Sequence, residues 1–281
     1  MGTRLFDRSE LIVATLRRVQ LFSKWPAETL AALESVGQLW RYAKGEAVYE
    51  ATEPATGLHI VVEGSLIHGR SWPNGKYMAT TIVRPGWPMN VMGAWDGIPY
   101  PNGGIARSDS LVIFVPRAAF LAAVRGDPAR IEDVTLFFCS QLRQDMEGLQ
   151  ARSVGSLRCL MAKYLAYLSR PSIHLSLAPG EPDAVDPTAF DVTQDELAAM
   201  LHTARQTVNR MMKEMERNGV LLREGNRLRI VNFLKLLAVM EEDEPIYSAW
   251  RAQIVAWHEK MQTKAARTAD AARDPAPALL R

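Results

Sequence analysis

The stretch Asp191–Asn232, DVTQDELAAMLHTARQTVNRMMKEMERNGVLLREGNRLRIVN, is the most informative part of the chain. Thr193, followed three residues later by Glu196, forms the capping box that satisfies free amides at the start of a helix. Apolar side chains then recur at helical spacing in two runs, separated by a short break at 202–204. These apolar positions are Leu197, Met200 and Leu201, then Val208, Met211, Met212 and Met215. The stretch therefore predicts two short helices joined by a tight turn.

The outer face of the second predicted helix carries long side chains that donate hydrogen bonds. They are Arg205, Gln206, Asn209, Arg210 and Lys213. In a helix-turn-helix the second helix enters the major groove of DNA, where such donors contact the edges of bases. We therefore predict that these residues bind DNA. Thr193 and Thr203, which precede the two helices, and Arg227 downstream complete the predicted DNA-binding set.

A hairpin is predicted directly after the second helix. Asn218-Gly219 supplies the left-handed residue that stops the helix, and LLREGNRLRIV then indicates two strands that turn at 224–226. Arginines stand around this turn, at positions 223, 227 and 229. A hairpin in this place is the wing of a winged helix-turn-helix, which contacts phosphates beside the groove.

Local charge separates DNA binding from the alternative, a capped helical pair with scattered surface arginines. From Thr203 to Lys235 the chain has eight Lys or Arg and three acidic residues, whereas the net charge of the whole chain is only +2. A phosphate backbone requires a basic patch concentrated on the reading helix and the wing. The charge pattern therefore favours DNA.

Length and composition favour a globular protein of two modest domains. The chain has 281 residues, of which 48% are hydrophobic and 23% charged. No apolar run approaches the length that crosses a bilayer, and the N-terminus mixes charges into its apolar positions, unlike a secretory signal. Cys139 and Cys159 lack the spacing of a metal site, which favours a reducing cytoplasm, and both fall on apolar helical positions, so we expect buried thiols.

The pattern changes twice before the DNA-binding stretch. Residues up to about Trp40 are expected to be helical, with Leu30, Leu33 and Val36 on one face. Short alternating runs between Arg41 and Phe120, with a turn signal at Asn74-Gly75, indicate an antiparallel jelly roll. The expected strands are Ala47–Tyr49, Leu58–Val62, Leu66–Gly69, Ala79–Val83 and Leu111–Val115.

A long helix is predicted from Pro128. Its apolar residues form a seam that suits pairing with a second copy of the chain, although packing on its own jelly roll is the alternative. The seam residues are Ile131, Val134, Phe138, Leu142, Met146 and Leu149. A further helix, Leu157–Leu168, leads into a loop, Ser169–Pro187, rich in Pro, Gly and Asp.

The predicted fold class is α+β, in four consecutive segments. They are a jelly-roll domain over 1–129, a dimerisation helix over 130–152, a winged helix-turn-helix domain over 153–237, and a helical extension with a tail over 238–281.

This order resembles the Crp/Fnr family of transcriptional regulators, in which a cyclic-nucleotide-binding-type jelly roll precedes a dimerisation helix and a winged helix. In the first domain the resemblance lies in Lys44-Gly45-Glu46, in Leu58–Leu66 (LHIVVEGSL) and in Pro85-Gly86. In the second, TQDELAAMLHTARQTVNRMMKEMERNG is close to the family pattern throughout. The resemblance implies that Arg205, Gln206 and Arg210 occupy the family's base-reading positions.

The phosphate-binding cassette departs from the family's cyclic-nucleotide pattern. The segment is PGWPMNVMGAWDGIPYPNGGIARS, and an ungapped alignment puts Tyr100 and Pro101 where the family has Arg and Ser. Arg107 falls some seven residues too late and is expected to begin the next strand. A cyclic phosphate in a partly buried cleft without a cationic partner is unfavourable. Control by cyclic AMP is therefore not expected.

Other departures concern cofactors and the reading helix. The N-terminus has no cysteine cluster for an iron–sulfur centre, and His59 and His68 are expected to be ordinary core or surface groups rather than haem ligands, so no cofactor is predicted. On the reading helix Gln206 replaces an acid, which shifts the preferred base towards adenine. His202 stands where a glycine is usual, so either the turn is slightly strained or the ring serves as an extra phosphate contact.

The altered cassette is rich in large apolar side chains, which allows two hypotheses. They are Trp87, Met89, Met92, Trp95 and Tyr100. These residues would line a pocket for an apolar or aromatic ligand, or they would fill the vacated nucleotide cavity and leave no small effector.

The C-terminal extension begins with an acidic break at 241–244. An amphipathic helix is predicted after it, with a face that packs on the chain's own dimer or on a partner such as RNA polymerase. Its apolar residues are Ile246, Trp250, Ile254, Trp257 and Met261. Beyond about Lys264 the composition predicts disorder.

An enzyme is the rival class, namely a cupin-like metal-dependent enzyme. Such a site needs closely spaced histidines with a carboxylate, and the chain offers only His59 and Glu63 on one strand and His68 beyond. The sequence therefore predicts a non-enzyme. It predicts a cytoplasmic homodimer that binds a pseudo-palindrome in double-stranded DNA.

Overall fold

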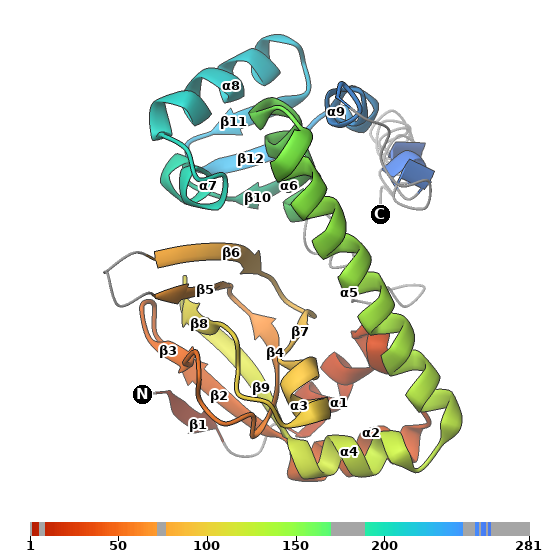
Figure 1. The fold of residues 1–281 in the computed structure, drawn as a ribbon. Helices are drawn as coiled ribbons and strands as arrows, with labels where there is room; N and C mark the ends of the chain where they lie inside the picture. Colours follow the sequence, from red (N-terminus) through yellow and green to blue (C-terminus); the bar gives the residue numbers. More distant parts are fainter. Residues whose placement is uncertain are drawn as a thin grey trace, which may run out of the picture. The chain divides into compact units, whose positions relative to one another are not determined.

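A computed structural model describes most of the chain as two compact units, one up to Asp145 and one made of Met146–Ser169 and the described residues from Ala189 onward (Figure 1). The described residues are 2–5, 9–71, 77–169, 189–243, 251–252, 254–256 and 258–259. Within this part of the chain, no helix is long and apolar enough to cross a membrane.

The first unit is an antiparallel jelly roll of two sheets, as predicted. One sheet has the order β1 (Thr3–Leu5), β2 (Gln38–Tyr42), β9 (Ser110–Pro116), β4 (Gly57–Glu63) and β7 (Pro88–Met89). The other has the order β3 (Ala47–Tyr49), β8 (Gly103–Ala106), β5 (Leu66–Ser71) and β6 (Tyr77–Val83).

Central strands form the core of this unit. β4 is paired on both sides, with β9 and β7, and its first five residues are buried. A central strand that is covered on both faces needs a near-continuous apolar run instead of alternation. That is why Leu58–Val62 stood out in the sequence.

Short helices cover the first sheet. They are α1 (Ser9–Arg18), the 3-10 helix η1 (Gln20–Phe22), α2 (Ala27–Val36), α3 (Val91–Asp96) and α4 (Arg117–Arg125). Leu16, Phe22, Leu33 and Phe120 from these helices join Ile60 and Ile113 of the sheet in one buried cluster.

The start of the unit differs from the expectation of helix up to Trp40. Thr3–Leu5 and Gln38–Tyr42 are paired strands, with Leu5 opposite Leu39. Val36 ends α2 with 42% of its surface exposed, while Leu30 and Leu33 are buried as predicted. Asn74-Gly75 lies outside the described residues, but the strands on either side pair at Ser71 and Tyr77, as a hairpin requires.

The long helix α5 (Pro128–Val154) divides the predicted seam between two environments. Val134 is buried in the first unit's core, and Phe138 is partly buried against it. Leu142, Met146 and Leu149 are 53–63% exposed. Val134 and Phe138 therefore pack on the chain's own jelly roll, whereas Ile131, which is 38% exposed, and the C-terminal part of the seam are open to solvent.

The second unit is a winged helix-turn-helix. Its helices are α6 (Leu157–Ser169), α7 (Gln194–Met200), α8 (Arg205–Arg217) and α9 (Phe233–Met240). Its sheet has the order β10 (Ala189–Asp191), β12 (Arg227–Ile230) and β11 (Leu221–Glu224). β10 is a third strand that the sequence did not predict, because its pairing with β12 is set by contacts far along the chain. Most of the loop 169–187 lies outside the described residues.

Candidate nucleic-acid interface

α7 begins with the predicted capping box. The Glu196 amide donates to Thr193 Oγ1 at 3.1 Å, and the Thr193 amide donates to Glu196 Oε2 at 2.7 Å. The Thr193 hydroxyl also donates to Glu196 Oε2 at 2.9 Å. The hydroxyl is thus engaged within the box, and Thr193 acts first as the residue that fixes where α7 starts.

The turn between α7 and α8 has the predicted backbone strain. His202 is exposed and has a φ of 50°, in the left-handed region that a residue with a Cβ adopts only at a cost. The Thr203 amide donates to the Ala198 carbonyl at 3.0 Å and closes the turn. This tight closure sets the angle at which α8 leaves α7.

α8 separates its buried and outward faces as the sequence indicates. Val208, Met211, Met212 and Met215 are buried. Arg205, Gln206, Arg210 and Lys213 are exposed, and Asn209 is half-buried. A hollow of about 630 Å³ runs over this face, lined by Gln206, Asn209, Arg210, Lys213, Glu216 and Arg217. Such a row of donors suits contact with base edges.

Two contacts from α7 constrain the reading helix, and sequence reasoning missed both. Arg205 Nη1 donates to Asp195 Oδ2 at 3.0 Å, and Gln194 Nε2 donates to Asn209 Oδ1 at 3.2 Å. In the sequence, Asp195 had the pattern of an acid in the first turn of a helix. Its partner becomes evident only when α7 and α8 pack together.

The wing is a two-strand hairpin beside α8. Glu224 pairs with Arg227, so Gly225 and Asn226 alone make the turn, and Gly225 has a φ of 64°. Arg227 is exposed at the start of β12. Its position at the tip of the hairpin would suit a contact with a DNA phosphate.

The structure distributes the five cassette residues over three environments. Met89 and Tyr100 are buried in one core cluster of the jelly roll, with Trp87 packed against it. Trp95 packs against the other core cluster. Met92 is 55% exposed. The five residues are therefore not gathered around one space, and Arg107 follows β8 rather than beginning the next strand.

Tyr100, which the ungapped alignment puts opposite the cassette arginine, is a buried, hydrogen-bonded side chain. Its hydroxyl donates to the Gly57 carbonyl at 2.9 Å and accepts from the Gly57 amide at 3.2 Å. Its ring meets the Tyr49 ring edge-on with 5.4 Å between centroids, and Tyr49 donates to the Met89 sulfur at 3.2 Å. The cassette is thus tied into the core.

Two histidines lie beside this cluster. Burial lowers the pKa of His59 to about 3 and that of His68 to about 4. His59 Nδ1 is 3.1 Å from the side-chain nitrogen Nδ2 of Asn90, and His68 Nδ1 is 3.1 Å from the Thr80 hydroxyl. Among the described residues, no group of three or more His, Cys, Asp or Glu side chains is placed to hold a metal ion.

The two cysteines are free thiols. Cys159 is buried, as predicted, whereas Cys139 on α5 is only half-buried. The prediction of a buried Cys139 was therefore only partly right, because this part of α5 is not covered on all sides by the core of the first unit.

Comparison with known proteins agrees with this architecture. Residues 39–127 match the family model of the cyclic nucleotide-binding domain, and residues 161–239 match that of the Crp-like helix-turn-helix domain. The solved structure of FixK2 from Bradyrhizobium japonicum has the same fold, with a TM-score of 0.62 at 18% identity over 76% of this chain and 100% of that one.

Two relatives extend the match over most of the chain. A CRP-like cAMP-activated global transcriptional regulator of Mycobacterium tuberculosis is 23% identical over 215 residues, which are 76% of this chain and 93% of the relative. The transcriptional activator protein FnrL of Cereibacter sphaeroides is 25% identical over 238 residues, which are 81% of this chain and 90% of FnrL. With both domains matched in the family's order, the chain belongs to the Crp/Fnr family of transcriptional regulators.

Proposed function

We propose that the chain is a sequence-specific regulator that binds a pseudo-palindromic DNA site as a homodimer, in the cytoplasm and without control by cyclic AMP. The observation that carries the proposal is the outward face of α8, where Arg205, Gln206, Arg210 and Lys213 are exposed while the opposite face is buried. A helix that offers a row of donors next to a basic wing has the geometry of major-groove reading.

Dimerisation is supported by α5. Leu142, Met146 and Leu149 are exposed and fall on one face at intervals of three or four residues. A second copy of the helix would cover this face through the same residues, as two-fold symmetry requires. Two reading helices would then enter successive major grooves about one helical turn apart.

Independence from cyclic AMP is supported by Tyr100. A cyclic phosphate needs a cation, and the position aligned with the cassette arginine holds a buried tyrosine that is hydrogen-bonded to Gly57. Of the two cassette hypotheses, a filled cavity therefore accounts for more of the structure than a pocket lined by Trp87, Met89, Met92, Trp95 and Tyr100. A cyclic nucleotide that bound the folded chain would raise its melting temperature further at each higher nucleotide concentration, roughly with the logarithm of that concentration, and we expect no such rise.

The test of DNA reading compares a reading-helix variant with a wing variant. Arg210→Ala should cost about 1–3 kcal/mol on the preferred DNA site and relax preference at one base pair. Arg227→Ala should weaken binding to all sequences alike and lower the slope of log affinity against log salt by about one. Fluorescence anisotropy on preferred and random duplexes over a salt series measures both. Equal losses on both duplexes for Arg210→Ala would contradict its role as a base reader.

A further inference from the structure

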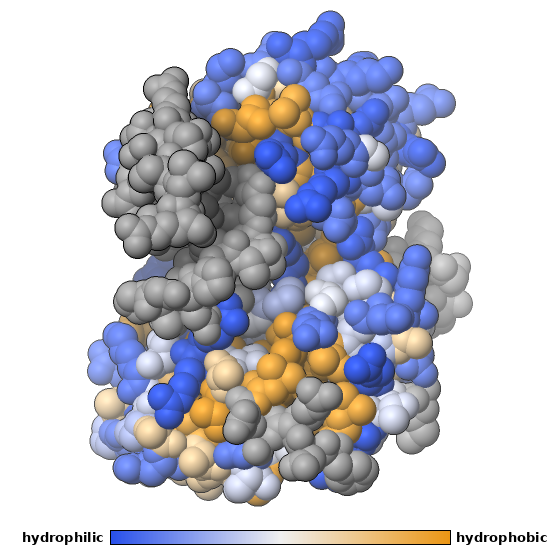
Figure 2. All heavy atoms as spheres, turned by 180° about the vertical axis from the view of Figure 1, so that it is seen from behind, coloured by the Kyte–Doolittle hydropathy of each residue, from blue (hydrophilic) through white to orange (hydrophobic). Residues whose placement is uncertain are grey.

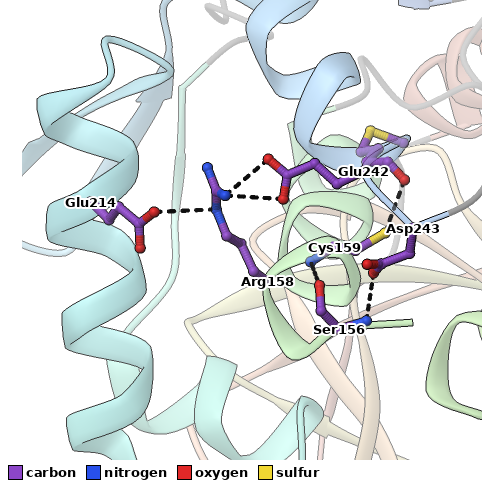
Figure 3. A network of polar contacts seen from close by, with 7 residues as sticks. Ser156, Arg158, Cys159, Glu214, Glu242 and Asp243 are labelled. Carbon is purple, nitrogen blue, oxygen red and sulfur yellow. Dashed lines mark hydrogen bonds and ion pairs between the residues drawn. The ribbon is translucent and has the colours of Figure 1, made fainter. Parts of the chain in front are cut away.

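Arg158, in the first turn of α6, lies between two carboxylates from distant parts of the chain (Figure 3). Its Nη1 is 2.9 Å from Glu242 Oε1 and donates to Glu242 Oε2 at 3.0 Å. Its Nε is 3.5 Å from Glu214 Oε1 on α8. That atom is buried and has no hydrogen-bond partner, so its contact with Glu214 is a charge interaction.

The start of α6 is anchored by the residues around Arg158. The Ser156 hydroxyl accepts from the Cys159 amide at 3.2 Å, and the Ser156 amide donates to the Asp243 carboxylate. The Cys159 thiol donates to the Met240 carbonyl at 2.9 Å. The acidic segment after α9 therefore fixes both the beginning of α6 and the orientation of the Arg158 side chain.

Glu214 lies on α8 where its carboxylate could pair with the proposed reading residue Arg210. It follows Arg210 by four positions on α8, the spacing at which an acid and a base on one helix pair with each other. In the described part of the chain no carboxylate pairs with Arg210, which is exposed on the reading face. Glu214 instead turns to Arg158 on α6, as Figure 3 shows.

We propose that Arg158 is a positioning residue for DNA recognition, which holds the Glu214 carboxylate away from Arg210 and leaves the Arg210 guanidinium available to bases. Glu242 orients Arg158 for this task, so the acidic segment that follows α9 takes part in DNA reading without touching DNA. The proposal rests on the proposed role of Arg210.

A purely structural role of the Arg158–Glu214 pair predicts different effects of substitutions on DNA binding. If the Arg158–Glu214 pair only stabilised the domain, removing either partner would weaken DNA binding alike, and removing both would be no better. If Arg158 restrains Glu214, the signs differ. Arg158→Gln should lower affinity for the preferred site about three- to tenfold, less than the loss of a whole arginine–base contact. Glu214→Gln alone should not weaken binding, and the double variant should regain the affinity that Arg158→Gln loses.

Net charge is controlled by two matched variants. Arg251→Gln also removes one positive charge from this unit, where Arg251 pairs with Glu241, and should leave the ratio of preferred-site to random-site affinity unchanged. Glu216→Gln, placed in the Arg158→Gln background, removes a negative charge from the same helix and from the reading face itself. Rescue by Glu214→Gln but not by Glu216→Gln supports the proposal. Equal rescue by both would overturn it, since general electrostatics would then explain the effect.

Glu242→Gln tests the second contact of Arg158. Glu242 is 39% exposed, so its isosteric amide leaves folding intact. We expect a loss of preferred-site affinity of about two- to fivefold, the range for one partly exposed ion pair. That loss should disappear in the Glu214→Gln background, and a loss that persists there would overturn the coupling. The unsubstituted chain is measured first on preferred and random duplexes. If the unsubstituted chain binds both duplexes equally, the proposed function itself is refuted, independently of the results for the variants.

Discussion

An ion pair holds Arg205 on the reading helix, and the proposed base contact of Arg205 requires DNA to break that pair. The side chains of Arg205 and Asp195 are 64% and 67% exposed, with 3.0 Å between Nη1 and Oδ2. A pair this exposed contributes about 0.2–1 kcal/mol, whereas a bidentate arginine–guanine contact supplies about 1–3 kcal/mol. DNA should therefore displace Asp195 at a small cost.

Asp195→Asn should tighten binding to the preferred site about two- to fivefold, because Arg205 no longer has to leave a carboxylate. Titration of labelled duplex with each protein measures the change. Asp191→Asn is the charge control. It removes one exposed aspartate from the same unit, opposite Arg227 in the β10–β12 pair, and so should affect preferred and random duplexes alike. The interpretation fails if Asp195→Asn binds no more tightly than Asp191→Asn.

His59 and His68 make the first unit sensitive to acid. Burial lowers the pKa of His59 from 6.5 to about 3 and that of His68 from 6.5 to about 4, so both are neutral in the fold. The unfolded chain takes up these protons below pH 6.5. The contribution of these two histidines to the free energy of unfolding is therefore fully present above pH 6.5. It is lost as the pH drops towards 4, by about 1.4 kcal/mol per pH unit for each histidine.

His59→Gln should flatten this dependence by about half, because it removes one of the two buried histidines. Urea unfolding of each protein at several pH values between 7 and 4 gives the slopes. Because slopes are compared, a uniform loss of stability in His59→Gln does not matter. If the free energy of unfolding of His59→Gln depends on pH as steeply as that of the unsubstituted chain, burial of His59 does not cause the acid sensitivity.

At the scale of elements, α5 makes the prediction with the clearest control. Leu142→Glu should convert the proposed dimer to a monomer, because it places a charge in the middle of the exposed apolar seam. Leu136 is exposed to a similar extent, 58% against 61%, but lies about 120° around the helix from Leu142. Leu136→Glu should therefore stay dimeric. Light scattering coupled to gel filtration measures both masses, and an unchanged mass for Leu142→Glu would remove α5 from the interface.

Elements specified by local signals were predictable from the sequence. α7 follows from its capping box, α8 from its four buried apolar positions and the wing from the residues of its turn, and all three are confirmed. β2 was missed because the apolar spacing of Leu30, Leu33 and Val36 does not reveal where a helix gives way to a strand. That change is imposed by pairing with β9, whose residues lie about 70 positions away.

The candidate site shows the same limit. The proposed reading residues could be named from the sequence because they fall on the outward face of one amphipathic helix. Their restraints could not, since Asp195 contacts Arg205 and Arg158 contacts Glu214 only after separate helices pack together. Tyr100 was identified as a replaced cassette residue, but its bond to Gly57 depends on the close approach of two segments 43 positions apart.

At the scale of the whole molecule, Figure 2 shows one face, on which the first unit mixes apolar and hydrophilic areas and the second unit is largely hydrophilic with one apolar patch. A hydrophilic surface that carries the donors of α8 and the wing arginines agrees with a nucleic-acid partner. The limits of the four segments expected from the sequence stay predictions, because the boundary between the compact units falls within α5. So does a contact of the C-terminal extension with RNA polymerase.

The central claim is that this chain reads DNA sequence without cyclic AMP. The direct measurement is in-vitro selection of genomic fragments by the purified, full-length protein, with and without added cyclic AMP. We predict enrichment of one pseudo-palindrome whose half-sites are about one helical turn apart, equally in both conditions. Recovered fragments with no sequence in common would contradict sequence-specific binding, and a palindrome recovered only with cyclic AMP would contradict the filled cassette.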